Sequence, residues 1–122
     1  MYSTQLEIPG LFEQMNLPMF PPDLVPAQGV GTSLQGYAKT TYAELVKKLG
    51  EPHQGKSGDG KVTVEWSFSY EDELFTVYDW KEGTTPDQLY WWHIGGTSAR
   101  ALAAFSLATG LDAMKPDERG II

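Results

Sequence analysis

Residues 61–70 read KVTVEWSFSY, and apolar and polar side chains alternate from position 62 to position 70. Valine and aromatic residues occupy one side of the pattern, whereas threonine, glutamate and serine occupy the other. Because successive side chains of a β-strand point to opposite faces of a sheet, this alternation predicts a half-buried strand. The letters EDE then predict a short polar turn, and LFTVYDW at 74–80 predicts the returning strand of a hairpin.

Further elements are predicted on both sides of this hairpin. QLYWWHI at 88–94 predicts a third strand. KTTYAELVKKLGEP at 39–52 predicts a helix, because Thr41 and Glu44 form a capping box, apolar residues recur on one face, and Gly50 and Pro52 end it. Thr97 or Ser98 is expected to cap a second helix that runs to about residue 108.

The resulting order is helix, three antiparallel strands, helix. This order predicts an α+β fold of two layers, with the helices on one face of a three-stranded antiparallel sheet. Large aromatic side chains are expected to fill much of the interface between the layers: Trp66, Phe68, Trp80, Trp91 and Trp92.

The start of the chain differs in composition from the rest. Five of the eight prolines, and no lysine or arginine, lie in the first 36 residues. We predict a proline-rich arm at 1–28 and a single domain at 29–122, with the glycine-rich stretch 29–36 as a loop and the tail after residue 110 irregular. The arm is too apolar for a solvated tail, so it is expected either to lie on the domain's own surface or to dock on a second chain, which would give a homo-oligomer.

Composition narrows the class of protein. The length of 122 residues indicates one domain, and the absence of cysteine excludes disulfides and thiolate metal sites and favours the cytoplasm. The net charge of −7 argues against direct binding to DNA or RNA, because such binding needs a basic face. The chain has no apolar run long enough to span a membrane and its first residues do not resemble a signal peptide, so no membrane contact is expected.

Catalytic and metal-binding patterns are weak. His93, Asp79 and Ser98 are the residue types of a nucleophile–base–orienter set, but no nucleophile-elbow pattern surrounds either serine of the GTS repeats. The two histidines are far apart in the chain and have no carboxylate at ligand spacing. We therefore predict a protein that is not an enzyme and that needs no metal or other cofactor.

The stretch WWHIGGTSARAL at 91–102 offers a candidate ligand site. Glycines and hydroxyls between a strand and a helix N-terminus suit a phosphate or carboxylate, because unpaired N–H groups converge there. Equally, the glycines can simply make the turn while the hydroxyls cap the helix. The candidate ligand-binding residues, with aromatic side chains that could stack on a base, are His93, Gly95, Gly96, Thr97, Ser98, Arg100, Trp92 and Tyr37.

Acidic side chains gather in the predicted hairpin. An acidic surface could dock on a basic partner protein, since complementary charge raises association rate and selectivity. The candidate protein-binding residues are Glu65, Glu71, Asp72 and Glu73. The alternative is a face that is merely solvated.

The strings GTSLQGY, TTYAELVKKLGEP, VEWSF, FTVYDWK and WHIGG together resemble a family of small phage and prophage proteins that has no established activity. The resemblance covers roughly residues 29–105. It implies a small accessory protein in the cytoplasm of a host cell, acting by binding and inhibiting a host defence factor, such as a nuclease-based complex, in the manner of an anti-CRISPR protein. Two alternatives stay open: a protein that sequesters a phosphate-bearing nucleotide signal, and a virion or assembly component.

Overall fold

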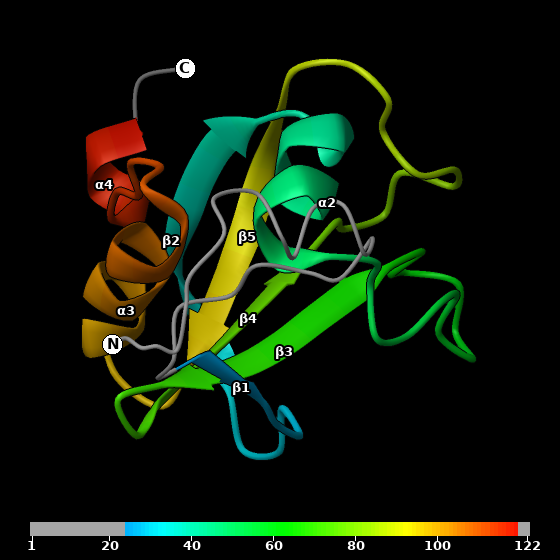
Figure 1. Cartoon of the computed structure of the whole chain (residues 1–122). Helices are drawn as coiled ribbons and strands as arrows, with labels where there is room; N and C mark the ends of the chain where they lie inside the picture. The colour runs from blue at the N-terminus through cyan, green and yellow to red at the C-terminus, as the bar shows by residue number, and fades with distance from the viewer. Residues whose placement is uncertain (1–23, 120–122) are drawn as a thin grey trace, which may run out of the picture.

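The computed structural model describes residues 24–119, in which five strands form one antiparallel sheet (Figure 1). The strand order is β1-β3-β4-β5-β2. In chain order the elements are β1 (Leu24–Pro26), β2 (Ser33–Thr40), α2 (Tyr42–Leu49), β3 (Glu65–Tyr70), β4 (Glu73–Tyr78), β5 (Tyr90–Gly96), α3 (Arg100–Thr109) and α4 (Pro116–Arg119). Residues 1–23 of the predicted arm lie outside the described residues.

The predicted hairpin and third strand are confirmed as β3, β4 and β5. Trp66 lies opposite Val77 and Phe68 opposite Phe75, so large apolar side chains face one another across the hairpin. Glu71 and Asp72 make the connection with positive φ angles of 52° and 69°. Two such residues give the turn a twist that matches the twist of the flanking strands.

The prediction of three strands was wrong, because two further strands flank this meander. β2 pairs with β5 from Ser33–Gly96 to Thr40–Tyr90, with a bulge between Leu34 and Gly36. β1 pairs with β3 at the opposite edge. Glycine in β2 and proline in β1 hide both strands from local patterns, and their stability comes from partners distant in the chain.

The first helix is confirmed together with its caps. The Thr41 hydroxyl accepts a hydrogen bond of 3.1 Å from the Glu44 N–H, as a capping box requires. Gly50 ends the helix with a φ of 82°, and its N–H donates to the Val46 carbonyl at 2.8 Å. Leu45 and Leu49 are buried beneath this helix.

The inner face of the sheet carries the core, and both α2 and α3 pack on it (Figure 1). Fully buried side chains from the strands and helices meet there: Trp66, Phe68, Phe75, Val77, Trp92, Ile94, Leu45 and Phe105. The prediction that Trp80 and Trp91 also fill this interface was wrong. Trp91 precedes the buried Trp92, so alternation places it on the opposite face, and Trp80 follows Tyr78 on that face too.

The second helix and the tail also differ from prediction in detail. Ala99 takes the N-cap position of α3 and makes no side-chain cap bond, although the Ser98 hydroxyl accepts from the Arg100 N–H at 3.2 Å. The tail is not wholly irregular, because it contains the short helix α4 and pairs Met114 with Tyr37 through two backbone hydrogen bonds of 2.9 Å.

The outer face of the sheet is crossed by the connection from β1 to β2. A Cβ added at Gly29 would meet side chains of Thr76, Glu65 and Ser67, so this connection lies directly on the sheet. Ser67 and Thr76 are consequently buried although they belong to the polar side of their strands. The rest of the outer face holds the aromatic groups described next.

Candidate functional site

Five aromatic side chains form a cluster on the outer face, away from the hydrophobic core. The strand register places Tyr78, His93 and Tyr37 in one row across β4, β5 and β2. The ring of His93 lies 5.0 Å from that of Tyr37, 5.3 Å from that of Tyr78 and 6.5 Å from that of Trp80, measured between centroids. Trp91 completes the cluster, 6.5 Å from Tyr37.

A groove with a volume of about 400 Å³ opens beside this cluster. It is lined by residues of the loop between β4 and β5 and of β5 itself: Trp80, Glu82, Leu89, Tyr90, Trp91 and His93. The volume falls within the range of small-molecule sites, roughly 300–1,000 Å³. Trp80 and Leu89 are exposed at its margin, at 39% and 60%, so large apolar groups are accessible to a ligand.

Positive charge accompanies the two indole rings of the groove. The ammonium nitrogen of Lys39 lies 5.5 Å from the centroid of Trp91. Those of Lys61 and Lys81 lie 5.8 and 5.7 Å from the centroid of Trp80. Such distances permit cation–π attraction. Each of the two indoles that line the groove therefore has an ammonium group beside it, in a protein whose net charge is −7, although none of the three lysines lines the groove itself.

Tyr90 connects the strand β5 to the loop that forms one wall. Its hydroxyl accepts a hydrogen bond of 3.1 Å from the backbone N–H of Trp80. Burial raises the pKa of Tyr90 to about 12, and the nearby carboxylates of Glu82 and Asp79 act in the same direction, against the Trp80 N–H, which lowers it. The phenol is therefore neutral throughout the physiological range.

The buried carboxylate of Asp79 anchors the same wall from the other side. Its Oδ1 accepts from the N–H groups of Thr63 and Val64 at 2.7 and 3.2 Å, and its Oδ2 accepts from the Thr63 hydroxyl at 2.7 Å. The Thr63 hydroxyl also lies 2.7 Å from that of Thr85, in the loop after Trp80. Asp79 thus joins the segment before β3 to the groove loop.

The structure separates the sequence-predicted ligand residues into different places. Tyr37 and His93 lie together in the aromatic cluster. Trp92 is fully buried on the inner face, 5.8 Å from Trp66 between ring centroids, and has no access to the groove. Gly95 and Gly96 have a packing role, because a Cβ at Gly95 would overlap the Thr76 hydroxyl and one at Gly96 would overlap Ala101.

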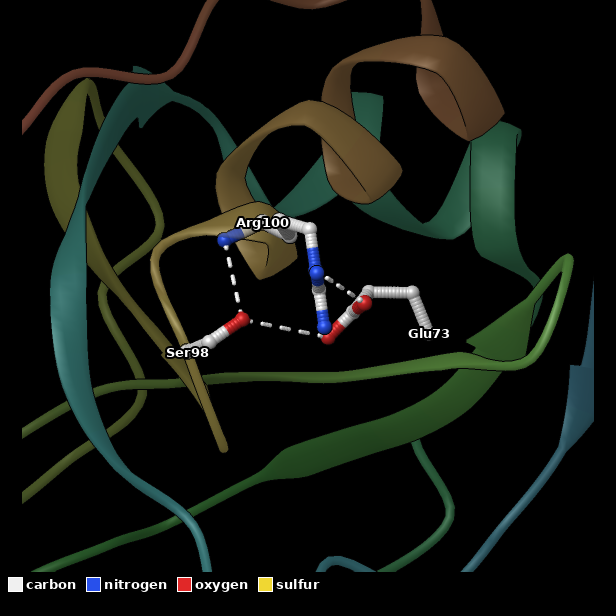
Figure 2. A network of polar contacts seen from close by, with 3 residues as sticks. All are labelled: Glu73, Ser98 and Arg100. Carbon is white, nitrogen blue, oxygen red and sulfur yellow. Dashed lines mark hydrogen bonds and ion pairs between the residues drawn. The ribbon is translucent and has the colours of Figure 1, made fainter.

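The remaining predicted ligand residues lie at the start of α3, where the chain provides its own anion (Figure 2). Arg100 Nε donates to Glu73 Oε1 at 3.0 Å, and the Ser98 hydroxyl lies 3.5 Å from Glu73 Oε2. Thr97 is exposed beside them. A phosphate at this helix start would have to displace the Glu73 carboxylate, so the geometry favours the capping and turn interpretation.

The four predicted protein-binding residues do not share one surface. Glu71 and Asp72 are exposed at the β3–β4 turn, whereas Glu73 is turned toward Arg100. Glu65 begins β3, at the opposite end of that strand from the turn, and accepts from the Ser67 hydroxyl at 3.1 Å. The exposed part of the acidic cluster is thus the turn itself.

The candidate catalytic residues each have contacts outside the proposed set. The Asp79 carboxylate is engaged by Thr63 and Val64, Ser98 contacts Glu73, and His93 lies in the aromatic cluster. Within residues 24–119, no group of three acidic, histidine or cysteine side chains is arranged to hold a metal ion. Over the same range every helix is too short or too polar to traverse a bilayer.

Comparison with protein-family models, with curated proteins and with solved structures gave no match to this chain. The candidate site is therefore defined by its geometry. Sequence reasoning missed several of its residues: Trp80, Glu82, Leu89, Tyr90, Lys39, Lys61 and Lys81. The sequence contained one indication of this site, because the alternation of β5 places Trp91 and Trp92 on opposite faces of the sheet. Nothing in the sequence indicated that the three lysines lie beside the indoles.

Proposed function

We propose that this protein binds a phosphate-bearing nucleotide in the outer-face groove, and that it acts by sequestering this ligand without altering it. The observation that supports the proposal is a groove lined by two indole rings, each of which has one or two lysine ammonium groups 5.5–5.8 Å from its ring centroid. A nucleotide carries the matching pair of features, a planar base and an anion. It is one of the ligand classes that the sequence suggested, and we propose a different site for it.

Each part of the groove corresponds to a part of such a ligand. Stacking of a base on an aromatic side chain contributes about 1–3 kcal/mol, and both Trp80 and Trp91 line the groove. Charge-assisted hydrogen bonds from Lys39, Lys61 or Lys81 suit phosphate oxygens. Elsewhere the acidic surface repels anions, so the local lysines direct an anionic ligand to this face.

Calorimetric titration of the full chain with nucleoside monophosphates and cyclic nucleotides tests the proposal. Trp80→Ala and Trp91→Ala should each weaken binding by about tenfold or more, because each removes one stacking partner. Arg100→Ala should leave binding unchanged, since that side chain pairs with Glu73 outside the groove, and Leu107→Ala on exposed α3 is a second control. The proposal would be refuted if no nucleotide bound, or if the Trp80 and Trp91 variants bound nucleotides as tightly as the natural chain does.

A second candidate function is inhibition of a host factor through the acidic turn, in a phage protein that acts in the host cytoplasm. It is supported by the exposure of Glu71 and Asp72 and by the sequence resemblance to phage proteins. The double variant Glu71→Lys, Asp72→Lys should weaken binding to a basic partner and reduce its dependence on salt. Unchanged capture of the partner by this variant would reject the acidic turn as the contact surface.

A further inference from the structure

We infer that Glu82 makes the groove selective for guanine among the nucleobases. The inference rests on the proposed function, because it concerns the base of the nucleotide proposed to bind there. It is derived from the position of one carboxylate on the groove wall and from the donor and acceptor pattern of the bases.

The segment that carries Glu82 is fixed on both sides. The Trp80 N–H donates to the Tyr90 hydroxyl at 3.1 Å, and the Lys81 N–H donates to the Lys61 carbonyl at 2.6 Å. Lys81 and Gly83 both have positive φ, 57° and 80°, so the chain turns sharply on either side of Glu82. The side chain of Glu82 is exposed and lines the groove together with Trp80, and it lies close enough to the Tyr90 hydroxyl to raise the pKa of Tyr90.

An ionised carboxylate has only acceptors, and it has two of them side by side. The Watson–Crick edge of guanine presents two adjacent donors, the N1–H and the N2 amino group. Adenine and cytosine present one donor beside an acceptor, and uracil presents one donor between two acceptors. Only guanine can therefore form a pair of parallel hydrogen bonds with Glu82, while its ring stacks against the indoles.

Glu82 carries the only carboxylate among the described residues that line the groove. The Tyr90 hydroxyl accepts from the Trp80 backbone N–H and has the Glu82 side chain beside it. The indole N–H groups of Trp80 and Trp91 can only donate. The lysines beside the indoles suit the phosphate, which every nucleotide carries. Discrimination between bases thus falls to Glu82, and a good bidentate pair discriminates by roughly 5-fold to 150-fold.

The experiment measures the affinities of the full chain for GMP and AMP and compares their ratio with that of Glu82→Gln. We expect GMP to bind about tenfold more tightly than AMP, the low part of that range because the groove is open. The glutamine side chain has the same shape but one donor and one acceptor, which matches adenine, so the variant should lose or invert the preference. Asp87→Asn, a loop residue outside the groove lining, is the matched control for loss of one negative charge.

The ratio removes the general effect of charge, because both ligands carry the same phosphate. Equal affinity of the natural chain for GMP and AMP would overturn the inference while leaving nucleotide binding in place, as would a guanine preference that Glu82→Gln retains. Failure of both nucleotides to bind would refute the proposed function, and the inference with it.

Discussion

Replacement of Asp79 should show how strongly the protein depends on one buried carboxylate. In Asp79→Ala the N–H groups of Thr63 and Val64 lose their acceptor. An unsatisfied buried donor costs about 1–3 kcal/mol. One N–H is only partly buried, so we expect a loss of about 3 kcal/mol in the free energy of unfolding, which corresponds to roughly 10 °C in Tm for a domain of this size.

The isosteric variant Asp79→Asn separates the hydrogen bonds from the packing. Both N–H groups donate to the same oxygen, Oδ1, so an amide oxygen there retains both of them, and the Thr63 hydroxyl exchanges its carboxylate acceptor for an amide N–H donor while it can donate to Thr85. A loss of about 1 kcal/mol is expected. Urea unfolding followed by tryptophan fluorescence measures both variants, with Asp87→Ala on the exposed loop as the control. A cost below 1 kcal/mol for Asp79→Ala, or equal costs for the two variants, would refute this account.

Three further predictions concern His53, the glycines and Arg100. His53 Nδ1 accepts from the Ser67 N–H at 3.0 Å, and burial lowers the pKa of His53 from its ordinary value of 6.5. The folded state therefore binds this proton less readily than the unfolded state, so the contribution of neutral His53 to stability is full above about pH 6.5 and is lost as pH falls through the lowered pKa. His53→Gln should make the urea midpoint depend less on pH between 7.5 and 5. Gly96→Ala should cost about 1–3 kcal/mol by overlap with Ala101, whereas Gly55→Ala, which has open space around it, should cost under about 0.5 kcal/mol in the same unfolding assay. Arg100→Ala should change stability by at most about 1 kcal/mol, because the side chain of Arg100 is 81% exposed, and a larger loss would mean that its pair with Glu73 does more than the geometry indicates.

The sequence predicts correctly those parts of the fold that depend on residues close together in the chain. The N-cap at Thr41 and the alternation in β3 each involve residues within one element, and the cap bond from the Glu44 N–H and the strand are both confirmed. β1 and β2 depend instead on distant partners, since Leu24 pairs with Tyr70 and Ser33 with Gly96. Local composition points to loops at both strands, and tertiary pairing overrides it.

In the candidate site, too, features that depend on neighbouring residues were predicted, and features that depend on distant residues were not. Aromatic richness around residues 91–93 identifies the correct region, and Tyr37 and His93 do meet. The choice between Trp91 and Trp92 depends on which face of β5 is buried, and this is known only once the helices are placed. The pairing of Arg100 with Glu73 joins two elements distant in the chain, so the occupied helix start has no signature in the sequence.

The topology has a consequence for synthesis on the ribosome. β1 and β2 emerge first, yet they occupy the two outer edges of the sheet, and the central strands that they join are made last. The nascent chain therefore cannot complete its sheet until Gly96 has left the exit tunnel: β1 can pair once β3 has emerged, whereas β2 has no partner strand until β5 follows. Because non-local pairing is intrinsically slow, we expect the pairing of β2 with β5 to be a late step in folding.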